Sequence, residues 1–256
     1  MFKAKTERIE KLAELFPDVV AELDRIFVAP TNIYLDWQNV IHWQDKLGWH
    51  IDAKRLKQFL DSFDTINVVS LYTGTLDGDE KSHKNIEDFK EMDYRVETKL
   101  VKIMPYSIDV SSVPANSPAL LQPFIKKPLL SVLNLETIEY LNSQLGKLNK
   151  QGIVQIEDKK CNFDVEIGRD MFLDLANDKA ACFILWSGDS DFVDPVTAIT
   201  EAGKTVFLFA TSGRVLSDLS ALNVPIFEIK KIKEFICWKK ELPQSILSKI
   251  SQQTST

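Results

Sequence analysis

The sequence is poor in cysteine, glycine and long apolar runs. Of its 256 residues, 3 are cysteine and 9 are glycine. The cysteines, Cys161, Cys182 and Cys237, are too few and too scattered for a disulfide framework or a paired-cysteine zinc site, so we expect a reducing compartment. No run approaches the roughly 18 apolar residues of a membrane span, and the N-terminus lacks an apolar signal-peptide core. These absences predict a cytoplasmic protein with no membrane partner.

Positive charge is also in short supply. The chain has 31 Lys and Arg against 37 Asp and Glu, a formal net charge of −6. Proteins that coat nucleic acid depend on Lys and Arg to displace counterions from phosphates, so this balance excludes general coating. It leaves open nucleic acid bound at one local site. A hydrophobic content of 45% is typical of a globular chain.

Short apolar runs alternate with amphipathic stretches, which is typical of a mainly parallel sheet covered by helices. Apolar residues at helical spacing predict helices over 52–63 and 164–177, and Asp194-Pro195 followed by Gly203 indicates a capped helix start and a stop. The expected buried face of the 164–177 helix consists of Val165, Gly168, Met171, Phe172 and Leu175. The predicted strands are 32–36, 66–72, 94–101, 181–186, 205–209 and 225–229. The sequence therefore predicts an α/β fold.

Three segments of different character divide the chain. Residues 1–30 indicate an N-terminal helical extension, 31–236 the α/β domain, and 237–256 a C-terminal tail, of which we expect 241–256 to be frayed. Within the domain, 102–150 is an insertion. Its part at 102–133 holds five prolines, which favour an irregular loop over a sheet element, and a helix pattern resumes at Leu135. This loop is either a surface insertion or a lid beside the site.

Carboxylates follow two of the predicted strands. Asp36 ends the first strand, and Asp189 and Asp191 follow the strand at 181–186. Because ligands bind at the carboxyl ends of parallel strands, we expect these acids on one rim, where like charges are costly unless a cation relieves them. An oxygen-rich, thiol-free cluster suits Mg²⁺ or Mn²⁺ rather than zinc. A solvated turn is the alternative for this loop.

The segment from Lys160 to Asp170 adds two more carboxylates. Asp164 stands at a predicted helix start, where it is either a metal ligand or an N-cap. Asp170 is six residues further on, about 120° around a helix, so it flanks the site and holds Lys160 or a water. Asp194 needs no such role, because its Asp-Pro context explains it as a helix cap.

Taken together, these segments resemble the NYN domain family, relatives of the PIN-domain nucleases that include LabA-like proteins. The resemblance covers about residues 31–230. It is carried by the order and spacing of Leu35-Asp-Trp-Gln-Asn39, the stretch Lys160 to Asp170, Leu185-Trp-Ser-Gly-Asp-Ser-Asp-Phe192, and Glu201-Ala-Gly-Lys-Thr-Val206.

The resemblance implies a three-layer α/β/α PIN-like (Rossmann-like) fold and a Mg²⁺- or Mn²⁺-dependent endoribonuclease. Its catalytic, metal-binding acids would be Asp36, Asp164, Asp189 and Asp191. The expected partner is RNA, single-stranded, and a homo-oligomer is left open. The side chains expected to contact substrate are Asn39, Ser187, Ser190 and Lys160. Trp37, His42 and Trp43 could stack on bases, although packing in the core or a loop is the preferred interpretation.

Other functional classes fit less well. A non-catalytic RNA-binding or regulatory NYN-domain protein would use the same rim, helped by the basic run from Lys230 to Lys240, unless that run is a solvated face. An aspartyl phosphatase needs a second acid two residues after the first, where Gln38 stands. A nucleotide-binding enzyme lacks support, because no glycine-rich phosphate loop follows the first strand.

Overall fold

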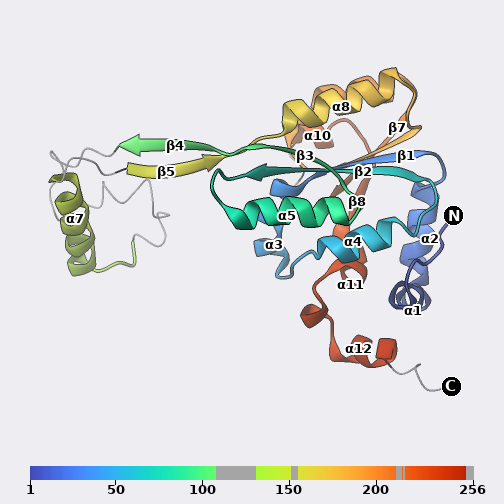
Figure 1. The fold of residues 1–256 in the computed structure, drawn as a ribbon, viewed down its shortest axis with the longest axis horizontal. Coiled ribbons are helices and arrows are strands. Elements are labelled where there is room, and N and C mark those ends of the chain that lie inside the picture. The colour runs from blue at the N-terminus through green and yellow to red at the C-terminus, as the bar shows by residue number, and fades with distance from the viewer. Residues whose placement is uncertain (108–130, 151–154, 212–214, 216, 252–256) are drawn as a thin grey trace. The chain divides into compact units, whose positions relative to one another are not determined.

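Figure 1 shows the computed structural model of the chain, which describes residues 1–107, 131–150, 155–211, 215 and 217–251. The chain divides into two compact units, one formed by 1–100 with 161–256 and the other by 101–160. All three cysteines lie in the first unit and are unpaired. Among the described helices, none has the length and apolar content needed to cross a bilayer.

The larger unit is built on a six-stranded sheet in which every neighbouring pair of strands is parallel. The strand order is β3-β2-β1-β6-β7-β8. The strands are β1 (Thr31–Asp36), β2 (Ile66–Thr75), β3 (Arg95–Leu100), β6 (Cys182–Trp186), β7 (Thr205–Ala210) and β8 (Ile226–Glu228). All six predicted strands are confirmed, with ends within three residues of those expected. The central strands β1 and β6 are buried at every residue, as a strand covered on both faces should be.

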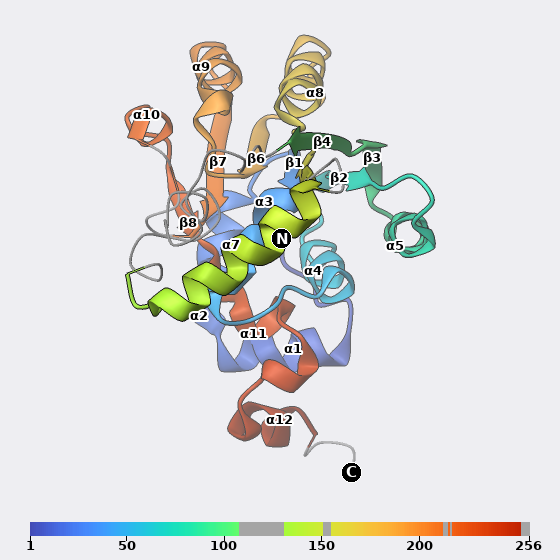
Figure 2. The same cartoon turned by 90° about the vertical axis from the view of Figure 1, so that its left-hand side faces the viewer.

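Helices cover both faces of this sheet, as Figure 2 shows. On one face lie α8 (Asp164–Ala176), α9 (Val193–Glu201) and α10 (Ser217–Ser220). On the other lie α1 (Glu7–Leu15), α2 (Pro17–Ile26), α3 (Trp37–Leu47), α4 (Ala53–Leu60) and α11 (Lys233–Ile236). Successive residues of β1 alternate between the two cores, with Ile33 and Leu35 in one and Tyr34 in the other. The predicted three-layer α/β/α fold is confirmed.

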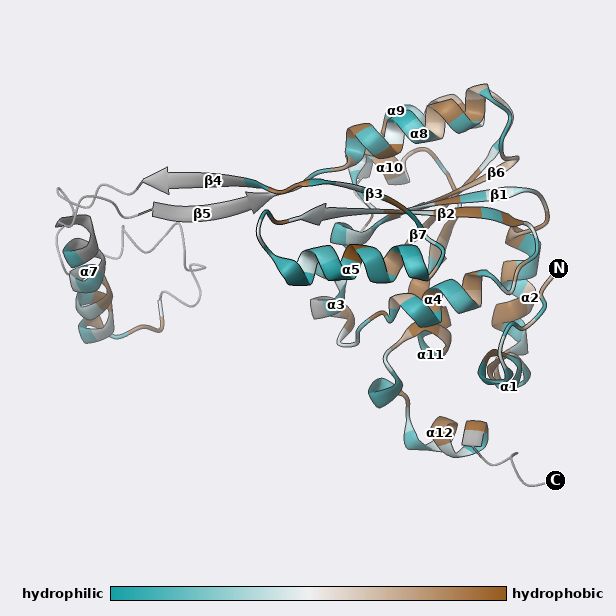
Figure 3. Cartoon of the chain, in the orientation of Figure 1, coloured by the Kyte–Doolittle hydropathy of each residue, from teal (hydrophilic) through white to brown (hydrophobic). Residues whose placement is uncertain are grey.

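The edge of the sheet at β3 is covered by α5 (Glu80–Glu91), a largely hydrophilic helix (Figure 3) whose buried residues are Ile86 and Phe89. Phe89 packs edge-to-face on Trp37, with ring centroids 5.4 Å apart. Trp37 and Trp43 are 8% and 3% exposed, so both belong to the core. The preferred interpretation is therefore confirmed for the two tryptophans, which are not base-stacking surfaces, whereas His42 is exposed on α3.

The first and last described segments of the chain pack against the core of the larger unit. Ile9 and Leu12 of α1 are fully buried, and so is Cys237. After the short turns η3 (Ile229–Ile232) and η4 (Lys239–Glu241), the chain forms α12 (Gln244–Ser251). The ammonium of Lys11 donates to the carbonyl of Ile250 at 2.8 Å. The prediction of a frayed tail is thus wrong up to residue 251, and 252–256 lie outside the described residues.

The smaller unit contains a two-stranded antiparallel ribbon of β4 (Lys102–Ser107) and β5 (Gln155–Lys160), together with α7 (Leu135–Lys150). The predicted helix from Leu135 is confirmed. The prediction that 102–133 holds no sheet element is wrong for 102–107, because both strands of a two-stranded ribbon are edges and an edge tolerates Pro105 without its N–H. The remainder of the proline-rich loop, 108–130, lies outside the described residues.

Candidate metal centre

The candidate site lies where the order of the strands reverses. Along the chain, β1 is followed by β2 and β3 on one side, whereas β6 adds to its other side. In open α/β sheets, ligands bind in the crevice at the carboxyl ends of such a strand pair. Asp36 ends β1, and the segment 187–191 follows β6.

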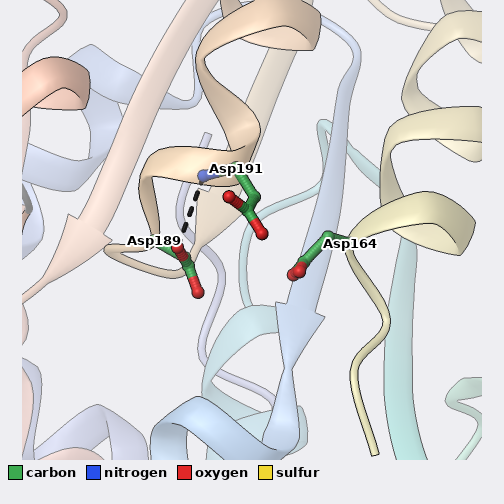
Figure 4. A group of neighbouring side chains, drawn as sticks. All are labelled: Asp164, Asp189 and Asp191. Atoms are coloured by element: carbon green, nitrogen blue, oxygen red, sulfur yellow. Dashed lines mark hydrogen bonds between the residues drawn. The ribbon is translucent and has the colours of Figure 1, made fainter.

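Three of the four predicted acids meet at this point. Asp164, Asp189 and Asp191 each present a carboxylate oxygen, and these oxygens lie within 4.8 Å of one another. Figure 4 shows the side chains converging, Asp164 from the first residue of α8 and the other two from the segment after β6. A single divalent cation can contact oxygens at this spacing, and carboxylates are the ligands that Mg²⁺ and Mn²⁺ prefer.

Asp164 stands in an environment that disfavours the charged form of its carboxyl group. Its Oδ2 is buried and, within the described part of the chain, has no hydrogen-bond partner. Burial raises the pKa of its carboxyl to about 7, with the carboxylates of Asp191 and Asp189 acting in the same direction and the Asn162 side chain opposing them. The N-cap of α8 is Phe163, without a side-chain cap bond, so the alternative that Asp164 caps the helix is wrong. This arrangement suits a cation that would supply the missing partner.

The loop after β6 is shaped by a short turn, η2 (Ser190–Phe192). Asp189 caps this turn by accepting the backbone N–H of Asp191 at 3.3 Å, which fixes the two acids relative to each other. Since Val193 N–H bonds to the Ser190 carbonyl, η2 continues directly into α9. The helix therefore starts at Val193, Asp194 lies exposed in its first turn, and the prediction that Asp194 caps it is wrong.

Asp36 lies at the same end of the sheet but outside the group of three. Only 6% exposed, it caps α3 by accepting from the Asn39 backbone N–H at 3.2 Å and from the Asn39 side-chain amide at 2.9 Å. The Ser187 hydroxyl is 3.5 Å from its Oδ2. The pKa of Asp36 is raised above its ordinary value, and burial is the main cause. The charge of Asp189 adds to this effect, whereas the hydrogen bonds from Asn39 oppose it. Its carboxylate is thus already engaged by protein donors.

Asn39 and Ser187 link Asp36 to the other acids. The Asn39 amide donates to the Ser187 hydroxyl at 3.0 Å, and that hydroxyl accepts the Asp189 backbone N–H at 3.4 Å. Ser187 is fully buried, so its hydroxyl serves this internal network. Ser190 is half-buried on η2. Lys160 belongs to the smaller unit, and its contact with substrate stays a prediction.

Asp170 anchors a network that the sequence did not reveal. Only 4% exposed, its carboxylate accepts from the Tyr72 hydroxyl at 2.8 Å, from Arg95 at 2.7 Å and from Arg169 Nε at 2.9 Å. Among the described side chains these three residues are its partners, and the Lys160 side chain, which the sequence suggested, lies outside that description. Burial acts to raise the pKa of Asp170, but the hydrogen bonds from Tyr72 and Arg169 and the charges of both arginines hold it below its ordinary value.

A groove between α8 and α9 opens beside the acids. It is a shallow hollow, open to solvent, with a volume of about 550 Å³. Val165 and Phe172, expected on the buried face of α8, are 80% and 42% exposed and line this groove, so that part of the predicted core is wrong. The groove is lined by Asn162, Asp164, Val165, Gly168, Arg169, Phe172, Asp191, Asp194 and Pro195.

The basic run near the C-terminus has local partners. Lys231 pairs with Glu22 at 2.7 Å, and the ammonium of Lys240 lies 4.4 Å from the centroid of the Trp238 ring. These contacts favour the interpretation of the run as a solvated face.

Comparison with known proteins supplies the family. Residues 128–223 match the family model described as NYN domain, a span that includes Asp164, Asp189 and Asp191. Over this span the chain is similar to NYN domains. The predicted resemblance is thereby confirmed, and NYN domains form part of a nuclease-like superfamily that is generally associated with RNA. The match does not extend to Asp36 and Asn39, which precede it.

Two further proteins are similar to this chain. The Low amplitude and bright protein LabA of Synechococcus elongatus is 21% identical over 217 residues, covering 84% of this chain and 91% of that protein. A crystal structure of a protein of unknown function from Vibrio parahaemolyticus aligns with a TM-score of 0.48 and 15% identity, covering 80% of this chain and 94% of the other.

Proposed function

We propose that this protein is a Mg²⁺- or Mn²⁺-dependent endoribonuclease that hydrolyses phosphodiester bonds of single-stranded RNA. The observation that carries the proposal is the convergence of Asp164, Asp189 and Asp191 within 4.8 Å, with one oxygen of Asp164 buried and without a hydrogen-bond partner among the described residues. A cluster of carboxylates that are not neutralised by basic side chains is costly for a fold to keep. The NYN-domain match over the same residues supports a nuclease-like use of the cluster.

The donor set fits a hard divalent ion. All three side chains offer oxygen, and in the described part of the chain no histidine or cysteine joins the group. When bound, such an ion would polarise the phosphoryl group and make a water nucleophilic near neutral pH. Asp164, Asp189 and Asp191 would hold it. Because Asp189 also caps η2 and fixes the Asp191 backbone, the two acids would keep their relative position when a ligand enters.

Asp36, Asn39 and Ser187 take a supporting role in this proposal. Asp36 adds a fourth negative charge, and its hydrogen bonds with Asn39 and Ser187 connect the ends of β1 and β6. We therefore assign Asn39 and Ser187 to positioning the acids rather than to contact with substrate. Ser190, half-buried on η2, stays a candidate for hydrogen bonding to phosphate.

The proposal is tested with purified protein, a 5′-labelled single-stranded RNA and either MnCl₂ or MgCl₂. We expect internal cleavage that stops in chelator and in Asp189→Asn, while Asp218→Asn, an exposed acid on α10, cleaves like the wild type. Cleavage that persists in chelator or in Asp189→Asn would contradict the proposed metal centre. RNA that is bound but returned intact under all metal conditions would favour a non-catalytic RNA-binding protein.

A further inference from the structure

The groove beside the metal centre has a wall that metal binding does not use. We call it the α8 groove, and it comprises the cavity lined by α8, by the start of α9 and by Asp191. Val165, Arg169 and Phe172 follow one another at spacings of four and three residues, so they form one stripe along α8. The stripe begins next to Asp164 and ends about 12 Å further along the helix axis, at 1.5 Å per residue. The groove therefore leads away from the acids.

The stripe is unusually apolar for a solvent-facing surface. Val165 is 80% exposed and Phe172 is 42% exposed, and Pro195 of α9 lines the same groove. Gly168 stands between Val165 and Phe172 and has no side chain to fill the space. A cavity with apolar walls and a few polar groups at one end is the usual form of a small-ligand site. An aromatic face and aliphatic neighbours at this place suit a flat, apolar-faced ring.

One cation stands in this apolar stripe. Arg169 contacts one oxygen of Asp170, Oδ1, with its Nε at 2.9 Å and its Nη2 at 2.7 Å, and its side chain is still 53% exposed. Arg95 pairs with Asp170 as well and lies 4.0 Å from Glu97, so Asp170 is shared between two guanidinium groups. Arg169 is thus held in a fixed position on the groove wall, and a guanidinium in such a position suits a phosphate group.

We propose that the α8 groove binds one unpaired nucleotide of the RNA next to the phosphodiester at the metal centre, with its base against Phe172 and Val165 and its phosphate at Arg169. This inference rests on the proposed ribonuclease function and names the part of the substrate that the site would grip. A base inside a duplex has no free face, so stacking on a protein side chain requires an unpaired nucleotide. The acids would face the phosphodiester at the metal centre, Arg169 would contact the phosphate of the bound nucleotide, and Phe172 and Val165 would contact its base.

The groove is tested by fluorescence anisotropy with a labelled single-stranded RNA, in Ca²⁺ in place of Mg²⁺, with the RNA checked afterwards on a gel for integrity. We expect Phe172→Ala to weaken binding by about 5- to 100-fold, the usual loss for a base-stacking aromatic. Phe172→Tyr keeps the ring and should bind within about twofold of the wild type. Leu173→Ala is the matched control, because Leu173 is the next residue of α8, is 52% exposed and does not line the groove.

A second arm identifies the ligand group. An RNA series carrying an abasic ribose at each position in turn should contain one position at which the wild type and Phe172→Ala bind equally, since the ring then has no base to contact. Arg169→Gln should reduce the slope of log affinity against log salt by about 0.7, the value for one phosphate contact on a single strand. In this variant Asp170 still accepts hydrogen bonds from Arg95 and Tyr72, so the fold should persist.

The outcomes separate the two proposals. Metal-dependent cleavage together with equal binding by Phe172→Ala and Leu173→Ala would overturn the groove proposal and leave the ribonuclease standing. Equal affinity for duplex and single-stranded RNA would overturn the groove proposal as well. Binding that depends on Phe172, without cleavage in any metal, would support the groove and overturn the ribonuclease.

Discussion

Asn39 donates its side-chain amide to the Asp36 carboxylate over 2.9 Å, and this bond ties the first turn of α3 to the end of β1. The same amide reaches the Ser187 hydroxyl after β6 at 3.0 Å. Two strand ends that carry acids are therefore joined by neutral donors rather than by basic side chains. This lets the negative charge of the site persist while its geometry stays fixed.

Asp36 is expected to act through the helix cap and its charge. Since asparagine caps a helix as well as aspartate, Asp36→Asn should change the free energy of unfolding by about 0.5 kcal/mol or less, and Asp36→Ala should lower it by about 1 kcal/mol. Urea titration measures both. Manganese titration should show a smaller loss of affinity in Asp36→Asn than in Asp189→Asn, because Asp36 lies outside the group of three. Equal losses would make Asp36 a direct ligand.

We expect the Asp164 carboxylate to destabilise the metal-free fold and to contribute to metal binding. Its buried oxygen has no hydrogen-bond partner in the described structure, and two carboxylates lie close by, so Asp164→Asn removes an unfavourable charge. We expect the metal-free variant to melt at or above the wild-type temperature and to lose the upward shift that the wild type shows in MnCl₂. Differential scanning fluorimetry measures both values.

A neighbouring acid provides the control for this experiment. Asp194→Asn changes an exposed acid that lines the same groove but is not part of the group of three, so it should keep the shift in MnCl₂. A metal-free Asp164→Asn protein that melts clearly below the wild type would contradict the view of Asp164 as a strained ligand.

Asp170 should contribute to the acid sensitivity of the fold. Its pKa is held below the ordinary value in the folded protein, so its stabilisation is complete above the unfolded pKa of about 3.9 and is lost as the pH falls through the lower folded pKa. Asp170→Asn should cost about 2 kcal/mol at neutral pH, the scale of hydrogen bonds to a charged group. The difference from the wild type should shrink below about pH 3.

Urea titrations across this pH range test the prediction for Asp170. Asp77→Asn, which alters an exposed acid in the turn before α5, is the control and should leave the free energy of unfolding unchanged at every pH. If Asp170→Asn lowers the free energy of unfolding equally at low and at neutral pH, the shape of the Asp170 side chain, rather than its charge, stabilises the fold.

Two glycines should respond to the same substitution with opposite signs. Gly168 lies inside α8, and a Cβ there would come no closer than 3.9 Å to Pro195, so Gly168→Ala should stabilise the protein by about 0.5–1 kcal/mol. Gly203 has φ +76°, and Gly203→Ala should cost about 1 kcal/mol because an L side chain is strained there. Urea titration measures the free energy of unfolding of both variants. A lower value for Gly168→Ala than for the wild type would show that the helices leave no room for a methyl group.

The sheet and the acid cluster could be predicted because their signals are local. Apolar runs such as 181–186 mark buried strands, and an acid directly after a strand must lie at its carboxyl end. Asp36, Asp189 and Asp191 followed from that rule, although Asp36 lies outside the group of three. Asp164 stands at a helix start, and its role as a ligand came from the family resemblance.

Other features depend on contacts between distant residues and left no local signal. Arg95 meets Asp170 across 75 positions of the sequence, and helical periodicity alone placed Phe172 in the core. Val165 and Phe172 are exposed because the true buried face of α8 is the one carrying Ile167, Asp170 and Met171. A buried aspartate on that face hid the correct period, since charge normally indicates the solvent side.

The ribbon of β4 and β5 begins and ends at paired residues, since Lys102 is the register partner of Lys160. Just inside the larger unit, the Cys161 thiol lies 4.0 Å from the Lys99 carbonyl. The polypeptide thus leaves the larger unit after β3 and returns to it, just before α8, at nearly the same point. We expect a chain spliced from Leu100 to Cys161 through a short glycine-rich turn, without the 60 positions 101–160, to keep all six strands in register.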